Sequence, residues 1–248
     1  MTIINIQPAK YGKFDKGYTN YFHMWTDLIF GLNHCMVTNN IETAKVCNDS
    51  PLFTSIIHNV IPNIQIISTF DEHETILYKG RNPHIIEWDN IDKSFHTAIF
   101  NKLTSAIEKK SQYILLIKRN TAKRYISNID TLAETLKTVY PLDEIIVSNL
   151  ENISFSEQVE LFHNAKLIIG QHGAALTNVL WTNPQCVIIE IDKNVGRTHH
   201  QNMCTYINRK YYKYAFAEGV PMSLKQKMEA EKHTLDIDDF VSFCKLKY

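Results

Sequence analysis

The sequence has no excess of charge of either sign, because its 26 lysines and arginines balance its 26 acidic residues over 248 positions. A neutral chain exerts no long-range attraction on nucleic acid or on an anionic membrane, so neither is expected as a partner. No stretch approaches the ~18 consecutive apolar residues of a membrane span. The N-terminus also has no basic-then-apolar signal segment. We therefore expect a cytoplasmic protein without a membrane span.

Cysteine is sparse, and its spacing indicates neither a bridge nor a metal knuckle. The five cysteines are scattered at positions 35, 47, 186, 204 and 244, which gives no sign of a disulfide framework and favours a reducing compartment. Asp236 and Asp238 match an Asp-x-Asp metal signature, but at the start of a terminal helix acidic residues serve the helix dipole. His199 and His200 are adjacent and point in different directions, which disfavours zinc. We predict no metal and no cofactor.

Short apolar runs alternate with helical patterns along the chain. The runs YILLI at 113–117 and CVIIEI at 186–191 are apolar on both faces, which is typical of parallel strands covered by helices on two sides. Strands are predicted at 2–6, 43–47, 64–70, 113–118, 144–147, 167–169, 186–191 and 212–216. Helices are predicted at 20–37, 51–60, 92–110, 129–139, 155–165, 174–182 and 199–207. The alternation predicts an α/β fold.

Two lobes and a tail are expected. The best boundary follows the long predicted helix at 92–110, because each side then holds its own set of strands and helices. The prediction is an N-terminal lobe at 1–110, a C-terminal lobe at 111–222 and a helical tail at 223–248.

The stretch LIIGQHGAALTN at 167–178 turns abruptly from an apolar strand into a helical pattern. Ligands of open α/β sheets bind at the carboxyl ends of strands, where a helix N-terminus offers N–H groups and partial positive charge to a phosphate. Gly173, Ala174 and Ala175 would let a phosphate oxygen approach the backbone closely, and His172 could add a donor. A tight turn with a packed histidine explains the same pattern without a ligand. The turn is neither a dinucleotide fingerprint nor a Walker loop.

A second strand end carries positive charge. The run at 113–117 is followed by Lys118, Arg119, Lys123 and Arg124. Arginine forks bind phosphate oxygens in a bidentate manner, and the alternative is a solvated basic loop. A second anion-friendly loop in the same half of the chain makes that alternative less favoured. Glu190, near the end of another strand, is either the acid that takes ribose hydroxyls in nucleotide-binding folds or a surface acid paired with a lysine.

Polar residues form one stripe on the apolar first helix. Asn20, His23, Asp27, Gly31 and His34 recur at spacings of three and four, and His23 can touch Asp27 at i,i+4. Such a stripe on a buried helix faces either a hydrogen-bonded core network or a wet cleft. In the second case the His–Asp pair suits general-base catalysis.

Four segments together resemble glycosyltransferase family 61. They are NYFHMWTDL at 20–28, the residues Arg119, Arg124 and Asn128, FSEQVELF at 155–162, and GQHGAALTN at 170–178 running on to Glu190 and Ile191. Their order and spacing fit over most of the chain, and the last segment is the most specific. Eukaryotic members are typically longer and anchored in the secretory pathway. A sequence without anchor or signal therefore suggests a bacterial or viral relative.

The resemblance implies a GT-B-like fold, in which two Rossmann-like lobes with parallel sheets face a cleft, and inversion at the anomeric carbon of a UDP-sugar. This donor is a co-substrate, with xylose favoured and N-acetylglucosamine next, and the acceptor is a glycan or glycoprotein. The implied base is Asp27 or His23, with Asn20 and His34 beside it on the acceptor side. The implied donor site comprises Arg119, Arg124, Ser154, Gln158, His172, Gly173, Ala174, Ala175, Asn178 and Glu190. The alternatives are a non-catalytic nucleotide-sugar or glycan-binding module and a Rossmann-type oxidoreductase.

Overall fold

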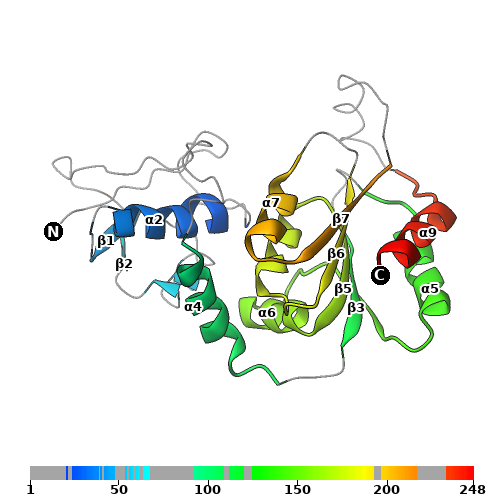
Figure 1. Cartoon of the computed structure of the whole chain (residues 1–248), viewed down its shortest axis with the longest axis horizontal. Helices are drawn as coiled ribbons and strands as arrows, with labels where there is room; N and C mark the ends of the chain where they lie inside the picture. Colours follow the sequence, from blue (N-terminus) through cyan, green and yellow to red (C-terminus); the bar gives the residue numbers. More distant parts are fainter. Residues whose placement is uncertain are drawn as a thin grey trace. The chain divides into compact units, whose positions relative to one another are not determined.

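The computed structural model of the chain separates into two compact units, Met1–Ile99 and Phe100–Tyr248 (Figure 1). The predicted lobe boundaries stay a prediction. The structure describes residues 21, 24–38, 40, 42–47, 54, 56–57, 60–61, 64–67, 92–108, 112–119, 125–192, 197–216 and 233–248. The strand predicted at 2–6 lies outside these residues.

The described part of the first unit contains a small parallel sheet and helices. Strand β1 (Ala44–Cys47) pairs in parallel with β2 (Ile64–Ile67), at two of the predicted strand positions. A π-helix, η2 (Met24–Phe30), runs directly into α2 (Gly31–Thr38). Helix α4 (Lys93–Thr104) leads from the first unit into the second.

The first helix is not the uniform α-helix that its sequence pattern predicts. Residues 24–30 close i→i+5 turns, and the α-helix begins at Gly31. The fully buried Trp25 and Phe30 anchor this segment, and the Phe30 ring meets Phe95 edge-on at 5.7 Å. The polar stripe was drawn with α-helical spacing, and the Asn20, His23 and Asp27 side chains lie outside the described residues. The stripe therefore stays a prediction.

The second unit is built on a five-stranded parallel sheet. Its strands are β3 (Tyr113–Ile117), β4 (Ile145–Ser148), β5 (Ala165–Gln171), β6 (Val187–Asp192) and β7 (Lys210–Ala215). Their order across the sheet is β4-β3-β5-β6-β7, and every neighbouring pair is parallel. All five strands lie at predicted positions, and the α/β class is confirmed.

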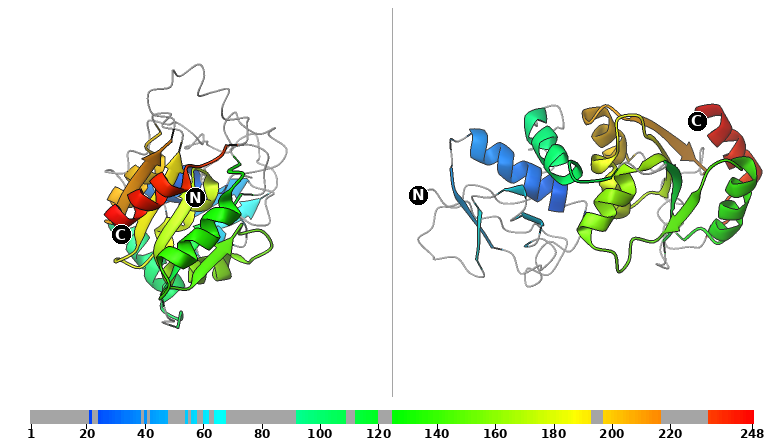
Figure 2. Two further views of the ribbon diagram at one scale, coloured as in Figure 1. Left: turned by 90° about the vertical axis from the view of Figure 1, so that its right-hand side faces the viewer. Right: turned by 90° about the horizontal axis from the view of Figure 1, so that it is seen from below.

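Helices cover both faces of this sheet (Figure 1, Figure 2). Helices α5 (Ile129–Val139) and α9 (Ile237–Lys247) pack together on one face. Helices α6 (Phe155–His163) and α7 (His199–Tyr206) lie on the other, and both pack against η4 (Ala174–Trp181). The segment η4 lies where a helix is predicted at 174–182, and it is a 3₁₀-helix. Burial on both faces explains why the strands are apolar throughout.

The strand order makes β3 and β5 the neighbouring strands at which the direction of the connections changes. The chain leaves β3 through α5, on one face, toward β4, and it leaves β5 through η4, on the other face, toward β6. Adjacent parallel strands whose following segments diverge to opposite faces mark the topological switch point, where open α/β sheets bind ligands. The residues that follow β3 and β5 therefore occupy the favoured ligand-binding position of this fold.

The C-terminal segment is fastened to the loop that precedes α5. The Asn128 side chain donates to the Leu235 carbonyl at 2.8 Å and accepts from the Leu235 N–H at 2.9 Å. Ile126 forms a parallel bridge with His233. Residues 233–248 are thus an integral part of the second unit.

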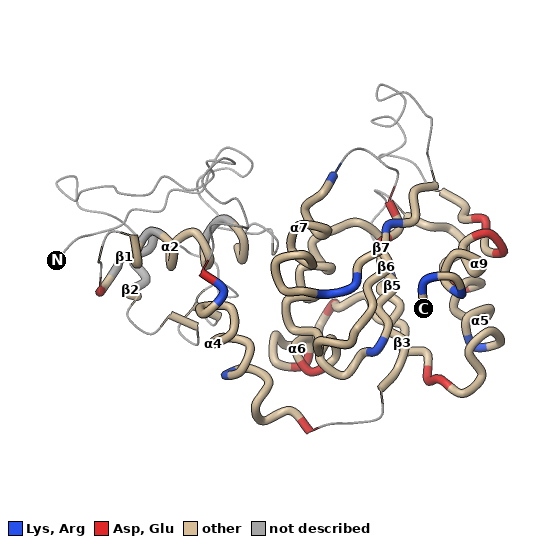
Figure 3. Tube along the Cα trace, in the orientation of Figure 1, with Lys and Arg blue, Asp and Glu red and all other residues tan. Residues whose placement is uncertain are grey.

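Helix α9 begins and ends as its dipole favours. Asp236 caps the helix by accepting from the Asp239 N–H at 3.0 Å, and acidic side chains at its start give way to lysines at its end (Figure 3). The Asp-x-Asp pair at 236–238 therefore has a structural role, as the sequence pattern indicates. Among the described residues, no helix has the length and apolar character needed to cross a bilayer.

Candidate active site

Arg119 lies across the turn that follows β5. It comes two residues after β3, and its Nη1 donates a hydrogen bond to the His172 carbonyl at 3.0 Å. A Cβ at Gly173 would stand 2.0 Å from that Nη1. The Gly173 backbone is extended, with φ of 166°, so glycine is needed here for space rather than for a special backbone angle. The small residue admits the guanidinium, which places positive charge at the switch point.

Of the predicted basic run, the structure describes Lys118 beside Arg119. Lys118 turns toward α5 and forms an ion pair with Asp130, with 2.8 Å between Nζ and Oδ1. Lys118 and Asp130 line an open pocket of about 540 Å³ together with Ser148 at the end of β4. Arg124 and its neighbour Lys123 lie outside the described residues. Of the two described cations, Arg119 contacts the turn and Lys118 contacts α5.

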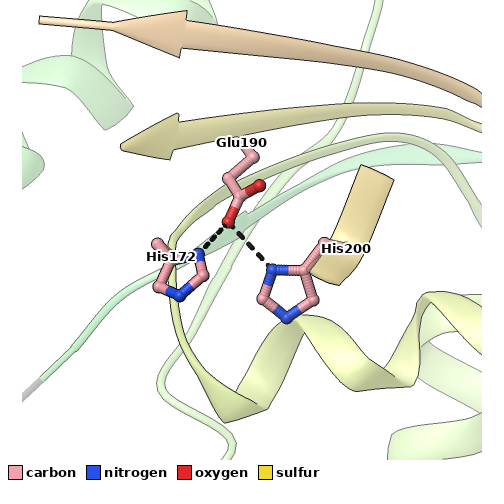
Figure 4. Close-up of side chains that lie close together, drawn as sticks. All are labelled: His172, Glu190 and His200. Carbon is pink, nitrogen blue, oxygen red and sulfur yellow. Dashed lines mark hydrogen bonds and ion pairs between the residues drawn. The ribbon is translucent and has the colours of Figure 1, made fainter. Parts of the chain in front are cut away.

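A buried carboxylate, Glu190, lies beneath the turn and gathers three side chains from three different elements. Its Oε1 is 2.5 Å from His172 Nδ1 and 2.9 Å from His200 Nδ1 (Figure 4). Its Oε2 accepts a hydrogen bond from the Tyr211 hydroxyl. The exposed fractions are 1% for Glu190, 2% for His200 and 8% for His172. Such a buried charge persists in proteins when it is fully hydrogen-bonded, as here.

The pleat of β6 explains why Glu190 faces this cluster. Its strand neighbours Ile189 and Ile191 belong to the core that packs against α5 and α9. Alternation along the strand turns Glu190 to the opposite face, where His200 of α7 lies. On the neighbouring strand β5, its register partner is Gly170, which has no side chain.

Burial governs the charge state of the cluster. Desolvation lowers the pKa of His172 below its ordinary 6.5, and outweighs the opposing effect of Glu190. For Glu190 desolvation acts to raise the pKa, but the hydrogen bonds from His172 and His200 outweigh it and hold the pKa well below the usual 4.5. Desolvation and the nearby carboxylate raise the pKa of Tyr211. At neutral pH the carboxylate is therefore ionised, the His172 ring is neutral and the Tyr211 hydroxyl is a donor.

The same three side chains carry the atom types that bind zinc. The candidate ligand atoms of His172, Glu190 and His200 all lie within 4.8 Å of one another. Tetrahedral zinc with bonds of ~2.0–2.1 Å keeps its ligand atoms ~3.3 Å apart. The nitrogen–oxygen distances of 2.5 and 2.9 Å are instead those of hydrogen bonds. The arrangement fits a hydrogen-bonded network better than a metal site, and the predicted absence of a metal stays a prediction.

Three other predicted donor-site residues make structural contacts within or between α6 and η4. Ser154 caps α6 through a complete capping box with Glu157, as the spacing predicts. Asn178 donates to Gln158 Oε1 at 3.0 Å and to the Ala175 carbonyl at 3.3 Å. These bonds hold the two helices that follow β4 and β5. Contacts of Ser154, Gln158 and Asn178 with a donor stay predictions.

The predicted acceptor residues are described only in part. Asn20 and His23 lie outside the described residues, and so does the Asp27 side chain, although its backbone is part of η2. His34 is half-buried on α2. The role of these residues as an acid–base group stays a prediction.

Sequence reasoning missed His200 and Tyr211. The adjacent histidines at 199 and 200 were set aside because they point in different directions, and that divergence is what buries His200 while His199 stays exposed. Tyr211 stands in a strand with five other residues of mixed polarity and carries no motif. Neither residue has a spacing that would link it to Glu190, since Tyr211 comes from the neighbouring strand β7 and His200 from helix α7.

Comparison with known families identifies the family of the chain. The family model described as Glycosyltransferase 61 matches residues 21–189. The chain belongs to glycosyltransferase family 61. The match includes the η2 segment, Arg119, the turn at 172–175 and the first part of β6, and it confirms the resemblance seen in the motifs.

Individual relatives within glycosyltransferase family 61 align over shorter stretches. The EGF domain-specific O-linked N-acetylglucosamine transferase of Gallus gallus is 35% identical over 79 residues, which are 32% of this chain and 15% of the relative. The Xenopus laevis protein of that name is 28% identical over 120 residues, 48% of this chain and 21% of the relative. The Protein O-linked-mannose beta-1,4-N-acetylglucosaminyltransferase 2 of Xenopus laevis is 28% identical over 127 residues, which are 50% of this chain and 22% of the relative. The aligned part is thus between 15% and 22% of these longer proteins.

Proposed function

We propose that this chain is a glycosyltransferase that moves N-acetylglucosamine from UDP-N-acetylglucosamine to a hydroxyl group of a glycan. The observation that carries the proposal is the turn at 172–175, which lies under the Arg119 guanidinium at the switch point between β3 and β5. A cation beside the start of a helical segment, at the carboxyl ends of parallel strands, is suited to a diphosphate.

In this proposal the second unit binds the donor, and the chain adopts a GT-B-like arrangement. The five-stranded parallel sheet with helices on both faces is one Rossmann-like unit, which supports the donor role. The small parallel sheet of β1 and β2 is in keeping with a second α/β lobe for the acceptor. A cleft between two such lobes would bring the acceptor to the sugar.

The chemistry would be an in-line displacement with inversion at the sugar C1. Arg119 would stabilise the negative charge that develops on UDP as the C1–O bond breaks, with Arg124 as a second cation. Asp27 or His23 would remove the proton from the acceptor hydroxyl, whose oxygen then forms the new bond to C1. Arginine charge in place of a metal ion predicts activity without added divalent cations.

The identity of the donor sugar is drawn from the relatives. Those compared above are named N-acetylglucosamine transferases, and one of them matches half of this chain. Their names favour N-acetylglucosamine over the xylose that the family resemblance alone favoured. The names also mention EGF domains and O-linked mannose, so a protein-linked glycan or a protein hydroxyl is a reasonable acceptor class to test.

The first test is thermal unfolding of the chain with UDP, GDP, CMP, NAD and a panel of UDP-sugars, each with and without EDTA. A ligand that binds the folded state alone at ~100 times its Kd adds about 2.7 kcal/mol to the free energy of unfolding, which is readily measured. We expect stabilisation by UDP that survives EDTA and is greatest with UDP-N-acetylglucosamine. A larger response to UDP-xylose would restore the original preference for xylose.

Other outcomes would overturn the proposal. Stabilisation by NAD without any by UDP would favour a Rossmann-type oxidoreductase. Stabilisation by UDP-sugars without transfer to any acceptor would favour a binding module. Asp27→Asn separates a transferase from a binding module. In a transferase this variant should abolish transfer and leave the Kd for UDP unchanged. Loss of stabilisation on adding EDTA would contradict the metal-independent scheme.

A further inference from the structure

The Glu190 carboxylate is already occupied, which changes what it can do for a bound nucleotide. Oε1 accepts from His172 at 2.5 Å and from His200 at 2.9 Å, and Oε2 accepts from Tyr211. With an exposed fraction of 1%, the carboxylate has little access to ribose hydroxyls. Its contacts point inward, to the two imidazoles and the phenol.

The network fixes the tautomer of His172. An ionised carboxylate can only accept hydrogen bonds, so the His172 nitrogen that faces it, Nδ1, carries the proton. In the neutral ring Nε2 then keeps its lone pair. Figure 4 shows that this second ring nitrogen points away from Glu190. The same reasoning orients His200, and the Tyr211 hydroxyl holds the carboxylate in place from its other oxygen.

The position of His172 relates this tautomer to a ligand. The residue follows β5 directly, and its carbonyl binds Arg119 Nη1 at 3.0 Å while its ring rests on Glu190. One residue thus joins the guanidinium at the switch point to the buried carboxylate. A diphosphate bound at the turn would meet Arg119 and the His172 ring together.

We propose that Glu190 is a positioning residue that holds His172 as a proton acceptor, and that His172 Nε2 takes up one proton from solvent when the diphosphate of a nucleotide sugar binds at the turn. The inference rests on the proposed function. The proton forms an N–H bond with the Nε2 lone pair, and no other bond changes. The resulting imidazolium lies between two anions, the Glu190 carboxylate below and the diphosphate above. It therefore adds a second positive charge to Arg119 as UDP leaves.

The charges around His172 make it responsive to an incoming anion. Glu190 and Asp192 of β6 favour the protonated ring, whereas His200 of α7 and Arg119 at the end of β3 oppose it. Desolvation tips the balance, because it lowers the pKa of His172 and keeps the ring neutral before binding. A diphosphate brings negative charge close to the ring in a weakly screened environment, which shifts the balance toward protonation.

The test is calorimetric titration of UDP-N-acetylglucosamine into the chain near pH 7, in buffers that differ in ionisation enthalpy. UDP-N-acetylglucosamine is the probe because its diester phosphates do not titrate near neutral pH. The slope of the observed enthalpy against the buffer enthalpy counts the protons taken up. We expect about one proton, and a Kd that rises about tenfold per pH unit where His172 is neutral when free and protonated when bound.

Variants separate positioning from structure. His172→Gln and Glu190→Gln should both abolish proton uptake and flatten the pH dependence of the Kd. His199→Gln, an exposed histidine on the same helix as His200, is the matched control and should leave uptake unchanged. Tyr211→Phe replaces Glu190→Gln as the test if Glu190→Gln does not fold, because it keeps the charge of Glu190. It removes the hydrogen bond that holds the carboxylate in place through Oε2. Nitrogen-15 shifts of the histidines in the Tyr211→Phe variant should therefore report a mixed His172 tautomer in place of the single Nδ1–H form.

The outcomes are distinct for the two proposals. If UDP-N-acetylglucosamine does not bind at any pH, the proposed function is wrong. If it binds without proton uptake and with a pH-independent Kd, the function stands and the role of His172 is overturned. Uptake that persists in both His172→Gln and Glu190→Gln would place the proton on another group and equally overturn the inference.

Discussion

Replacing Gly173 by alanine should weaken nucleotide binding while folding is nearly unaffected. The new Cβ would lie 2.0 Å from Arg119 Nη1 and 3.2 Å from its Cζ, so the guanidinium must leave its position. It then loses the 3.0 Å hydrogen bond to the His172 carbonyl. The backbone itself accepts alanine, because a φ of 166° is extended and open to any residue.

The expected size follows from the charge that is displaced. A hydrogen bond with a charged partner contributes about 1.5–3 kcal/mol, so a diphosphate that loses Arg119 should bind about 10- to 150-fold more weakly. The effect on folding is smaller. Arg119 is half-buried and can turn to solvent. Alanine in place of glycine also lowers the entropy of the unfolded chain, which stabilises the folded state by about 0.4–1 kcal/mol.

The assay is the Kd of UDP by calorimetry beside the free energy of unfolding in urea. Arg119→Ala supplies a double-mutant cycle, in which Gly173→Ala should add nothing once Arg119 is gone. Gly170→Ala is the matched control, because its Cβ would meet Leu176 Cδ2 at 2.7 Å and so disturb packing rather than Arg119. It should lower stability more than Gly173→Ala does. A Kd for Gly173→Ala within about twofold of the wild type, or full additivity with Arg119→Ala, would refute the reasoning.

Three further predictions concern folding. Asn128→Ala removes both hydrogen bonds to Leu235 and should lower the free energy of unfolding by about 1–3 kcal/mol, with faster amide exchange over 233–248; unchanged exchange there would contradict the fastening role. Ser154→Ala should cost about 1 kcal/mol in urea unfolding with the Kd for UDP unchanged, and a weaker Kd would restore its predicted donor contact. Stability should fall as pH drops below 6.5, because the lowered pKa of His172 lets the unfolded chain bind that proton first, and again below 4.5 through Glu190. Urea midpoints measured from pH 7.5 to 4 check this, and a rise in stability over that range would oppose it.

Much of the second unit was readable from the sequence, for physical reasons that can be named. Strands buried on both faces must be apolar throughout, so the apolar runs at 113–117 and 186–191 indicated buried strands. The capping box at Ser154 is local chemistry, and the structure has it as predicted. Local rules were less successful at η2, where the predicted α-helix is a π-helix, and at η4, where it is a 3₁₀-helix. Both segments bury a large side chain completely, Trp25 in η2 and Trp181 in η4, and such tertiary packing is not part of a local pattern.

By itself the sequence determined the α/β class, the family, and the two strand ends at which charge and small residues gather, because each of these is written in contiguous residues. Pairing between distant strands decided the rest. The order β4-β3-β5-β6-β7 places Arg119 beside the turn, where the guanidinium leaves no room for a side chain at position 173. The pleat of β6 and the position of α7 bring Glu190, His172 and His200 together. The sequence of β6, an apolar run with one glutamate, does not indicate which residues that glutamate contacts. Contacts of this kind depend on which side chains meet across the sheet, and spacing along the chain does not encode them.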